Sequence, residues 1–419
     1  MKTLHITNAF HASSGGVATS YKALMREANR NGRLMRLVVP SDRDRVERVG
    51  ECGLIYHVAA PHSRMFDTRY RTILPHRYLL SRSGPIWNIL KAEQPDLLEV
   101  RDKFCLNWLG GLFRKSWHEG VKRPVLVGCS SERMDDNLAA YVVSGNAGVR
   151  FARLYMRYCY VPLFDFHLAN SSYTAEEITA SMTAKHSRPV FVRSEGIDCE
   201  VFRPDNRDPS VRRTLLSQTG GNTQSLLLLY CGRLAPEKNV ALLADIMERL
   251  SACDAGDYRL AVAGAGPLAA DLENRLKSRA PRRFALLGHV PERAELARLY
   301  ASCDIFIHPN PREPFGIAPL EAMASGLAVV VPSSGGVLSY ANDSNAWLAE
   351  PTAESFAEAA IQASNPEARL AKGLNARKTA ERHDWPVVAT ELFTLFDQLT
   401  ESRSRAIARS QPSMRCLYG

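Results

Sequence analysis

Short apolar runs alternate with segments of helical periodicity along most of the chain. In the first half, the runs occupy residues 3–7, 35–39, 55–58, 97–100, 125–127, 167–169 and 190–192. In the second half, they occupy residues 226–230, 260–263, 284–287, 305–307 and 328–331. Helical segments such as residues 17–30 and 106–117 lie between them. Apolar strands separated by helices predict an α/β fold whose parallel sheets are covered by helices on both faces.

The two halves predict two doubly wound, Rossmann-like domains. A chain of 419 residues is too long for one ordinary core, and domains of roughly 150–200 residues are the usual size. The stretch 194–198 and the polar region 207–223 place a linker near residue 195. We therefore predict an N-terminal domain over residues 1–195 and a C-terminal domain over residues 196–384. An amphipathic helix over about 385–400 and a disordered, basic tail over residues 402–419 complete the prediction.

Composition narrows the class of protein. Hydrophobic residues make up 45% and charged residues 23% of the chain, as in soluble globular proteins. No run reaches the roughly 20 apolar residues of a membrane span, and the polar start at Met1 is unlike a signal peptide. The nine cysteines are scattered without CxxC pairs, which argues against a disulfide framework or a zinc site. We expect a cytoplasmic protein.

The formal net charge of +9 is unevenly placed. Between Arg64 and Arg82, five arginines face a single acid, and aromatic and aliphatic residues are interleaved with them. Such a segment can contact the anionic inner face of a membrane peripherally; a solvated Arg-rich face or attraction for a phosphorylated substrate explains it equally. A nucleic-acid partner is disfavoured, because no recognisable aromatic stacking platform accompanies the basic residues.

The strongest candidate site lies between the runs at residues 305–307 and 328–331. Pro319 is tolerated only in a first helical turn, so a helix is expected to begin near Ile317 and to end before Gly326. Its N-terminus offers free N–H groups, which suit anionic oxygens such as those of a diphosphate. Glu313 and Glu321 flank this point, eight residues apart, and can accept hydrogen bonds from sugar and ribose hydroxyls. A surface helix with acids near its N-terminal turn is the alternative.

A second candidate follows the run at residues 226–230. Lys238 is predicted at a helix N-terminus, where the helix dipole disfavours a cation. A phosphate would explain that placement, with Arg233 as a second clamp on a departing diphosphate. An exposed lysine beside a paired arginine is the alternative.

Three other turns supply weaker candidates. Gly16 follows the first predicted strand, where a glycine lets the backbone approach phosphate or sugar oxygens. Gly266, and then His289 with Val290, follow two strands of the second half and can form the wall around a nucleobase. The turn around Gly16 is not a GxGxxG fingerprint, and no P-loop sequence occurs, so NAD and ATP sites lose support.

Together these motifs resemble glycosyltransferase family four, whose members have the GT-B fold of two domains facing across a cleft. The resemblance rests on Gly232-Arg233-Leu234, Glu237-Lys238-Asn239, Gly264-Ala265-Gly266-Pro267 and the E-x7-E signature that begins at Glu313 and ends at Glu321. Glu195 stands where the family usually has Asn. The resemblance is strong over residues 195–340 and only architectural over residues 1–190.

The resemblance implies roles for these residues. Glu313 would contact the transferred sugar, and Phe315, Gly316 and Ile317 would offer backbone groups to the sugar and the diphosphate. Glu321 would bind the ribose, while Arg233 and Lys238 would bind the phosphates. Gly16 would approach the donor from the facing domain, and the last helix would cross back onto the N-terminal domain. No metal ion, cofactor or covalent enzyme residue is implied.

One departure concerns the acceptor side of the cleft. The family often carries a His after the strand predicted at residues 125–127, and Ser131 stands near that place here. The segment resembles the mannosyltransferase-type and glycolipid-type branches. Ser131 would then bind the sugar and Glu132 or Asp135 the acceptor, or else Ser131 is a plain helix N-cap.

The function implied is retaining transfer of a hexose, with mannose favoured, from a GDP- or UDP-sugar to a glycan, glycolipid or related acceptor. Two alternatives remain: a nucleotide-sugar epimerase or hydrolase of the same fold, and a catalytically silent subunit that binds nucleotide sugars. The donor base, the acceptor, the linkage and the oligomeric state are not readable from the sequence.

Overall fold

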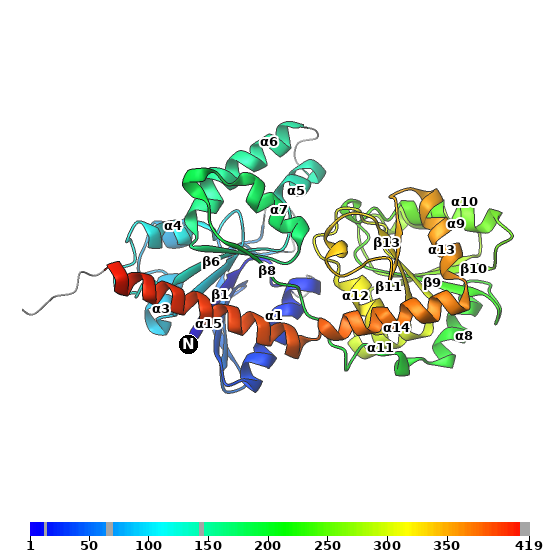
Figure 1. Ribbon diagram of the computed structural model, residues 1–419, viewed down its shortest axis with the longest axis horizontal. Coiled ribbons are helices and arrows are strands. Elements are labelled where there is room, and N and C mark those ends of the chain that lie inside the picture. The colour runs from blue at the N-terminus through cyan, green and yellow to red at the C-terminus, as the bar shows by residue number, and fades with distance from the viewer. Residues whose placement is uncertain (12–14, 64–69, 142–145, 411–419) are drawn as a thin grey trace, which may run out of the picture.

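The computed structural model describes residues 1–11, 15–63, 70–141 and 146–410, which form two α/β domains side by side (Figure 1). The described residues contain an eight-stranded sheet, ordered β3-β4-β2-β1-β5-β6-β7-β8, and a six-stranded sheet, ordered β11-β10-β9-β12-β13-β14. The predicted α/β class with two doubly wound sheets is confirmed.

The N-terminal domain contains the larger sheet. Its strands are β1 (Lys2–Thr7), β2 (Leu34–Ser41), β3 (Arg45–Val49), β4 (Gly53–Ala59), β5 (Leu97–Arg101), β6 (Val125–Ser130), β7 (Phe166–Ala169) and β8 (Val190–Val192). Its helices are α1 (Gly15–Arg30), α2 (His76–Leu79), α3 (Pro85–Glu93), α4 (Trp108–Arg114), α5 (Met134–Tyr141), α6 (Asn146–Tyr155) and α7 (Ser172–Ser181). All strand pairs are parallel except β3 with β4. The sequence did not predict β3, because this edge strand is polar and exposed.

The C-terminal domain contains the smaller sheet, which is parallel throughout. Its strands are β9 (Leu226–Cys231), β10 (Tyr258–Ala263), β11 (Phe284–Gly288), β12 (Ile305–Ile307), β13 (Ala328–Pro332) and β14 (Trp347–Ala349). Its helices are α8 (Pro209–Gln218), α9 (Leu242–Ala252), α10 (Ala269–Arg279), α11 (Arg293–Ser302), α12 (Ile317–Ala324), α13 (Ala353–Ala363) and α14 (Pro366–Arg382).

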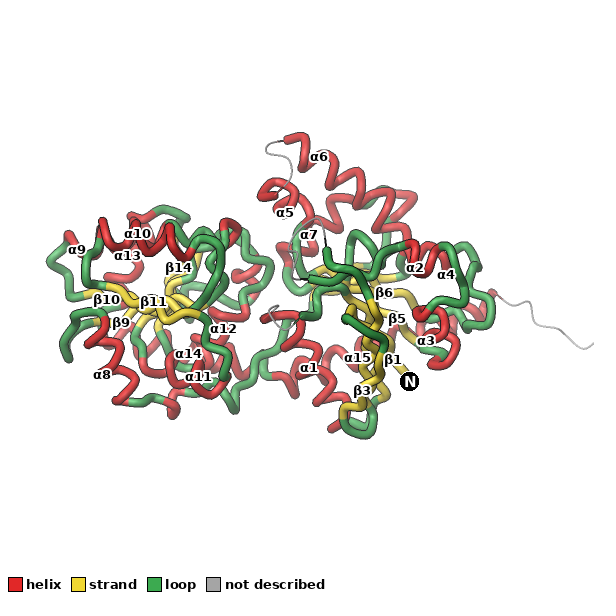
Figure 2. Tube along the Cα trace, turned by 180° about the vertical axis from the view of Figure 1, so that it is seen from behind, coloured by secondary structure: helices red, strands yellow, loops and turns green. Residues whose placement is uncertain are grey.

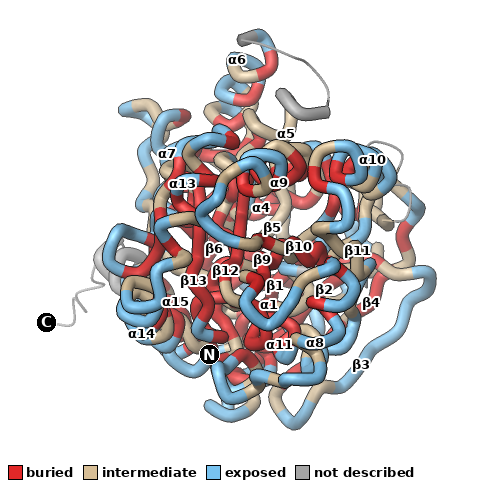
Figure 3. Tube along the Cα trace, turned by 90° about the vertical axis from the view of Figure 1, so that its right-hand side faces the viewer, coloured by how far each residue is buried: buried red, intermediate tan, exposed pale blue. Residues whose placement is uncertain are grey.

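Each sheet is covered by helices on both faces (Figure 2). Side chains that alternate along a strand enter two different cores: Leu227 and Leu229 of β9 pack on one face, and Leu228 and Tyr230 on the other. Figure 3 shows the central strands as a buried layer beneath exposed helix surfaces, whereas the edge strand β3 is exposed. This two-sided burial explains why the strands read as continuous apolar runs.

Two chain segments cross between the domains and pair with each other. The Ile197 N–H donates to the His383 carbonyl at 2.8 Å, and the Trp385 N–H donates to the Ile197 carbonyl at 3.0 Å. A Cβ built on Gly196 would lie 2.5 Å from the Trp385 ring, so only glycine fits beneath the indole. Glu195, the departure from the family pattern, pairs with the Arg101 guanidinium.

The last helix, α15 (Trp385–Ser410), returns to the N-terminal domain. Its residues Phe393 and Phe396 are buried with Tyr21 and Leu24 of α1, and Arg33 pairs with Asp397 at 2.5 Å. The predicted tail over residues 402–419 is wrong for its first part, because α15 continues to Ser410; residues 411–419 lie outside the described residues. In the described part of the chain, no helix combines the length and apolarity that a membrane crossing requires.

Candidate active site

The candidate residues meet where parallel strands of the C-terminal sheet end. β12 lies beside β9, so the loops that leave the carboxyl ends of these two strands are neighbours. The loop after β9 carries Arg233 and Lys238, and the loop after β12 carries Glu313. Ligands of doubly wound sheets bind at this edge.

The carboxylate of Glu313 is the centre of the site. Its Oε2 accepts three hydrogen bonds: from Lys238 Nζ at 2.7 Å, from Asn310 Nδ2 at 3.0 Å and from His308 Nε2 at 3.1 Å. Glu313 is only 7% exposed. Burial opposes ionisation, but the Lys238 charge and these hydrogen bonds hold the pKa of Glu313 well below its usual range. The carboxylate is therefore ionised and fixed in place.

Two of these partners were missed by the sequence reasoning. His308 and Asn310 are buried and follow β12 directly, in the loop that leads to Glu313. A polar pair after a buried strand at the ligand edge of a sheet was the available signal. His308 Nδ1 is buried and has no hydrogen-bond partner within the described residues.

The helix α12 begins at Ile317 as predicted, and no side chain caps it. Gly316 adopts φ 88° at the N-cap, where a Cβ would lie 2.9 Å from the Tyr340 hydroxyl and from Val337. Phe315 is buried and packs edge-on against Tyr340 at 5.2 Å between centroids, so only its backbone can serve a ligand. The N-terminus of α12 is therefore closely packed around Gly316, and no side chain caps its first N–H groups.

The segment that follows β13 also fixes the loop of Glu313. The Gly336 N–H donates to the Glu313 carbonyl at 2.7 Å. A Cβ on Gly336 would lie 1.8 Å from the Pro314 carbonyl oxygen. Gly336 therefore allows the close backbone approach that fixes Glu313.

Glu321 lies one turn into α12 and is its only charged residue. It is half-buried and accepts a hydrogen bond from the Tyr300 hydroxyl at 3.1 Å. Burial raises the pKa of Glu321 to about 7. The two carboxylates of the E-x7-E signature therefore differ: Glu313 is ionised, whereas Glu321 titrates near neutrality.

The basic pair has a geometry that differs from the prediction. Lys238 does not begin an α-helix: it ends the 3-10 turn Pro236–Lys238, Asn239 follows with φ 52°, and α9 starts only at Leu242. The helix-dipole argument for Lys238 was therefore wrong, and its position is set instead by the contact with Glu313. Arg233 is exposed, with Nη1 3.8 Å from Glu237 Oε1.

The loops after β10 and β11 border the same edge. A Cβ on Gly266 would lie 2.3 Å from the Leu234 carbonyl oxygen, so this glycine lets the loop pack against the segment that follows Arg233. His289 is exposed, and Val290 is half-buried against the core below α12. These positions leave the wall around a nucleobase as a prediction.

The N-terminal domain touches the loop of Glu313 directly. The Ser171 hydroxyl, at the N-cap of α7, donates to the Pro314 carbonyl at 2.5 Å. Arg312 Nε lies 3.9 Å from Asp136 Oδ1 on α5. A Cβ built on Gly16 would lie 3.5 Å from Ile317 Cδ1, so α1 faces the N-terminus of α12. The two domains therefore meet around the same few residues.

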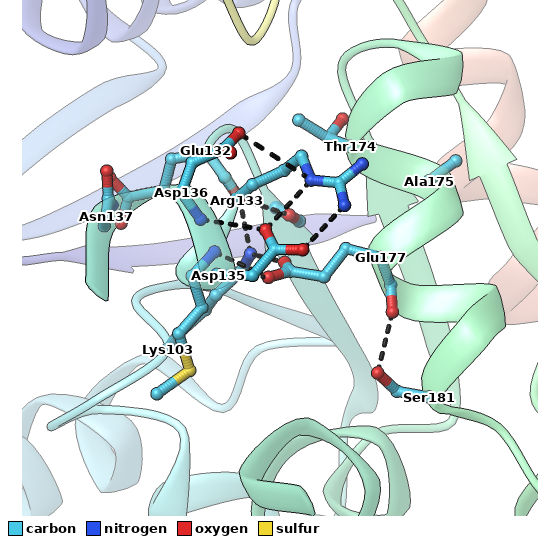
Figure 4. A network of polar contacts seen from close by, with 12 residues as sticks. Lys103, Glu132, Arg133, Asp135, Asp136, Asn137, Thr174, Ala175, Glu177 and Ser181 are labelled. Carbon is cyan, nitrogen blue, oxygen red and sulfur yellow. Dashed lines mark hydrogen bonds and ion pairs between the residues drawn. The ribbon is translucent and has the colours of Figure 1, made fainter. Parts of the chain in front are cut away.

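Figure 4 shows the polar network at the start of α5. Glu177 on α7 accepts the N–H groups of Met134 and Asp135 at 2.6 and 3.0 Å and pairs with Lys103 at 2.5 Å. This buried glutamate caps α5, so the alternative that Ser131 is the N-cap was wrong.

Ser131 instead accepts a hydrogen bond from Arg101 Nε at 2.9 Å. The Glu132 side chain is exposed and accepts from Asn137 Nδ2 at 3.0 Å. Within the described residues, neither side chain forms a hydrogen bond with Glu313. Their roles toward sugar and acceptor stay predictions.

The described residues contain no group of three or more His, Cys, Asp or Glu side chains that is arranged to hold a metal ion. The positive charge at the edge comes from Lys238, Arg233 and the N-terminus of α12. That set is suited to anionic oxygens, while Glu313 is suited to hydroxyl groups.

Comparison with known proteins agrees with this architecture. Residues 211–379 match the family described as Glycosyl transferases group 1. The chain is 29% identical to the GDP-mannose-dependent alpha-(1-6)-phosphatidylinositol dimannoside mannosyltransferase of Mycobacterium tuberculosis, over 96% of this chain and 97% of the relative. It is 27% identical to a GDP-mannose-dependent alpha-mannosyltransferase of Mycolicibacterium smegmatis, over 96% and 99%. Sucrose-phosphate synthase from Thermosynechococcus elongatus shares the fold, with a TM-score of 0.74, 16% identity and coverage of 96% and 100%.

Proposed function

We propose that this chain, a glycosyltransferase with the GT-B fold, transfers mannose from GDP-mannose to a glycolipid or related glycan acceptor with retention of configuration. Its resemblance to glycosyltransferase family four predicted this fold and this class of enzyme. Two relatives aligned along nearly the whole chain are named for GDP-mannose, and one of them is named for a phosphatidylinositol mannoside. Those names support the donor and the acceptor class proposed here.

The observation that carries the proposal is the convergence of Lys238, His308 and Asn310 on one oxygen of Glu313. A carboxylate held ionised at a fixed position can accept hydrogen bonds from hydroxyls of the transferred sugar. Its cationic neighbour Lys238 and the N-terminus of α12 would then face the diphosphate of the same donor.

Transfer breaks the bond between the anomeric carbon and the diphosphate oxygen. Negative charge develops on the departing GDP, and Lys238 and Arg233 stabilise it together with the N–H groups at the start of α12. The acceptor oxygen bonds to the same face of the anomeric carbon, and its proton passes to the departing diphosphate. We assign no covalent enzyme residue. No metal ion is needed in this scheme, because side chains and the helix terminus supply the positive charge.

Peripheral contact with an anionic membrane would suit a lipid-linked acceptor. Of the arginines between Arg64 and Arg82, Arg64 and Arg69 lie outside the described residues. Arg71 donates to the Ala60 carbonyl at 2.7 Å, and Arg82 pairs with Glu119 at 3.0 Å. The described part of this segment contains one short helix, α2, so its membrane role and a cytoplasmic location stay proposals.

The test is a donor screen followed by product analysis. The purified chain is heated with GDP-mannose, GDP, UDP-glucose or UDP, with EDTA present throughout. We expect GDP-mannose to raise the melting temperature most, and transfer to a mannosylated glycolipid extract to give an α-linked product by NMR. Stabilisation by UDP-sugars alone would refute GDP-mannose as the donor. Donor hydrolysis or epimerisation without transfer would favour the alternative of a nucleotide-sugar hydrolase or epimerase. Donor binding without turnover would favour the alternative of a catalytically silent subunit.

A further inference from the structure

The helix α6 presents an apolar ridge to solvent. Phe151, Leu154 and Tyr158 are 57%, 51% and 62% exposed, and their spacing of three and four residues places them on one helical face. The opposite face is buried through Ala152, Met156 and Tyr160. The helix continues without a break into the π-helical turn Met156–Tyr160, so the ridge spans both elements. Scattered exposed apolar residues are ordinary, but three in one row are not.

A row of arginines runs beside this ridge. Arg150, Arg153 and Arg157 each precede one of the three apolar residues, and Arg150 and Arg153 are exposed. No acidic residue occurs from Asn146 to Phe164. The α6 ridge (Phe151, Leu154 and Tyr158, with Arg150 and Arg153) therefore combines an apolar row with positive charge that no neighbour along this stretch of sequence balances.

The position of α6 leaves the ridge accessible. Figures 1, 2 and 3 show α6 rising above the rest of the molecule, beyond α5 and α7. The preceding helix α5 carries Asp136, which lies 3.9 Å from Arg312 beside Glu313. The ridge therefore follows directly in the chain after α5, the helix that contacts the loop of Glu313.

We propose that the α6 ridge docks on the surface of an anionic phospholipid bilayer. Apolar side chains on one helical row would enter the headgroup region, while the adjacent arginines would contact lipid phosphates. A second copy of this chain is a poorer occupant, because packing ridge on ridge would bring arginine rows together without an acid to balance them. This surface is separate from the Arg64–Arg82 segment considered above, and its binding to a bilayer does not depend on the donor.

The test is co-sedimentation of the full chain with vesicles. We expect binding to phosphatidylcholine mixed with phosphatidylglycerol, little binding to phosphatidylcholine alone, and weakening as salt rises. Replacing Phe151, Leu154 and Tyr158 by Ser should weaken binding by at least about tenfold, the scale for one buried apolar side chain. The pair Arg150→Glu and Arg153→Glu should abolish the preference for anionic vesicles.

The matched control is the pair Leu370→Ser and Leu374→Ser. These residues of α14 are 66% and 58% exposed but lie among acids and bases of mixed sign, and we expect unchanged vesicle binding. Thermal unfolding and stabilisation by GDP establish that each variant is folded; should the Ser variant unfold, the Arg pair decides.

Three results would overturn the proposal. They are a wild-type chain that ignores anionic vesicles, variants that bind as wild type does, or a wild-type dimer that the Ser variant dissociates. Failure of GDP-mannose transfer with vesicle binding intact would count against the proposed function alone.

Discussion

Replacing Lys238 by Met removes the ammonium group and keeps much of the side-chain volume. Lys238 Nζ lies 2.7 Å from Glu313 Oε2, and the two side chains are 26% and 10% exposed. Removing one partner of a buried ion pair costs about 3–5 kcal/mol. Because Lys238 is a quarter exposed and because His308 and Asn310 remain on the same oxygen, we expect about 2–3 kcal/mol of lost unfolding free energy.

The effect on turnover has a separate cause. If Lys238 stabilises the departing diphosphate, its loss should reduce kcat by at least about a hundredfold, or about 2.7 kcal/mol of transition-state stabilisation. Combining Lys238→Met with Glu313→Gln removes both charges, so the double variant should regain part of the stability and none of the activity. That split separates a catalytic contact from a structural one.

The assays are urea unfolding and initial rates at saturating donor. Lys277→Met is the matched control: its ammonium lies 2.7 Å from Glu273 but the pair is exposed, so a change below about 0.5 kcal/mol and a normal rate are expected. A Lys238→Met enzyme within threefold of the wild-type rate would refute the assigned role of Lys238. A double variant that regains activity together with stability would show that the pair is only structural.

Three further predictions concern other residues of the site. Because burial raises the pKa of Glu321 from 4.5 to about 7, the folded wild-type chain binds more protons between these values. As pH rises from about 4.5 to about 7, the wild-type chain should therefore lose about 3 kcal/mol of unfolding free energy relative to the Glu321→Gln variant, and the difference should then level off. Parallel curves of stability against pH for the two proteins would contradict this prediction. Ser171→Ala removes the bond to the Pro314 carbonyl as well as a helix cap, so kcat should fall roughly tenfold for the loss of one hydrogen bond. Thr352→Ala, which removes only the cap of α13, should cost about 1 kcal/mol of stability and leave kcat unchanged; equal rates in both variants would argue against domain contact through Ser171. Gly336→Ala would place a Cβ 1.8 Å from the Pro314 carbonyl oxygen and should weaken GDP-mannose binding at least about tenfold by displacing Glu313. Gly373→Ala, where the nearest such atom is 3.4 Å away, should bind normally in the same calorimetric titration.

The local pattern was sufficient wherever one element dictated its own structure. The strand β12 begins and ends at the predicted residues, because a strand buried on both faces must be apolar throughout. The bounds of β8 were also predicted, although this edge strand is partly exposed. The start of α12 followed from Pro319, which fits only a first turn, and its end from Gly326, which adopts φ 79°. The polar edge strand β3 carried no such signal.

Contacts between distant residues could not be read in the same way. The contact between Lys238 and Glu313 spans 75 positions, and only the adjacency of β9 and β12 brings the two residues together. His308 and Asn310 contact the same carboxylate from nearby positions, but their role depends on how the loop after β12 folds around Glu313. Glu177 caps α5 across more than 40 residues, which no local motif predicts.

The sequence by itself therefore determined the class of fold and the charges available at the ligand edge, since both depend on which residues follow each strand. The tertiary structure decided which of those charges touch. It gave Lys238 a carboxylate partner in place of a helix terminus, and it brought Ser171 of one domain onto the loop of the other. Strand order within the C-terminal sheet sets the first contact and the packing of one domain on the other sets the second, and both are properties of the packed chain.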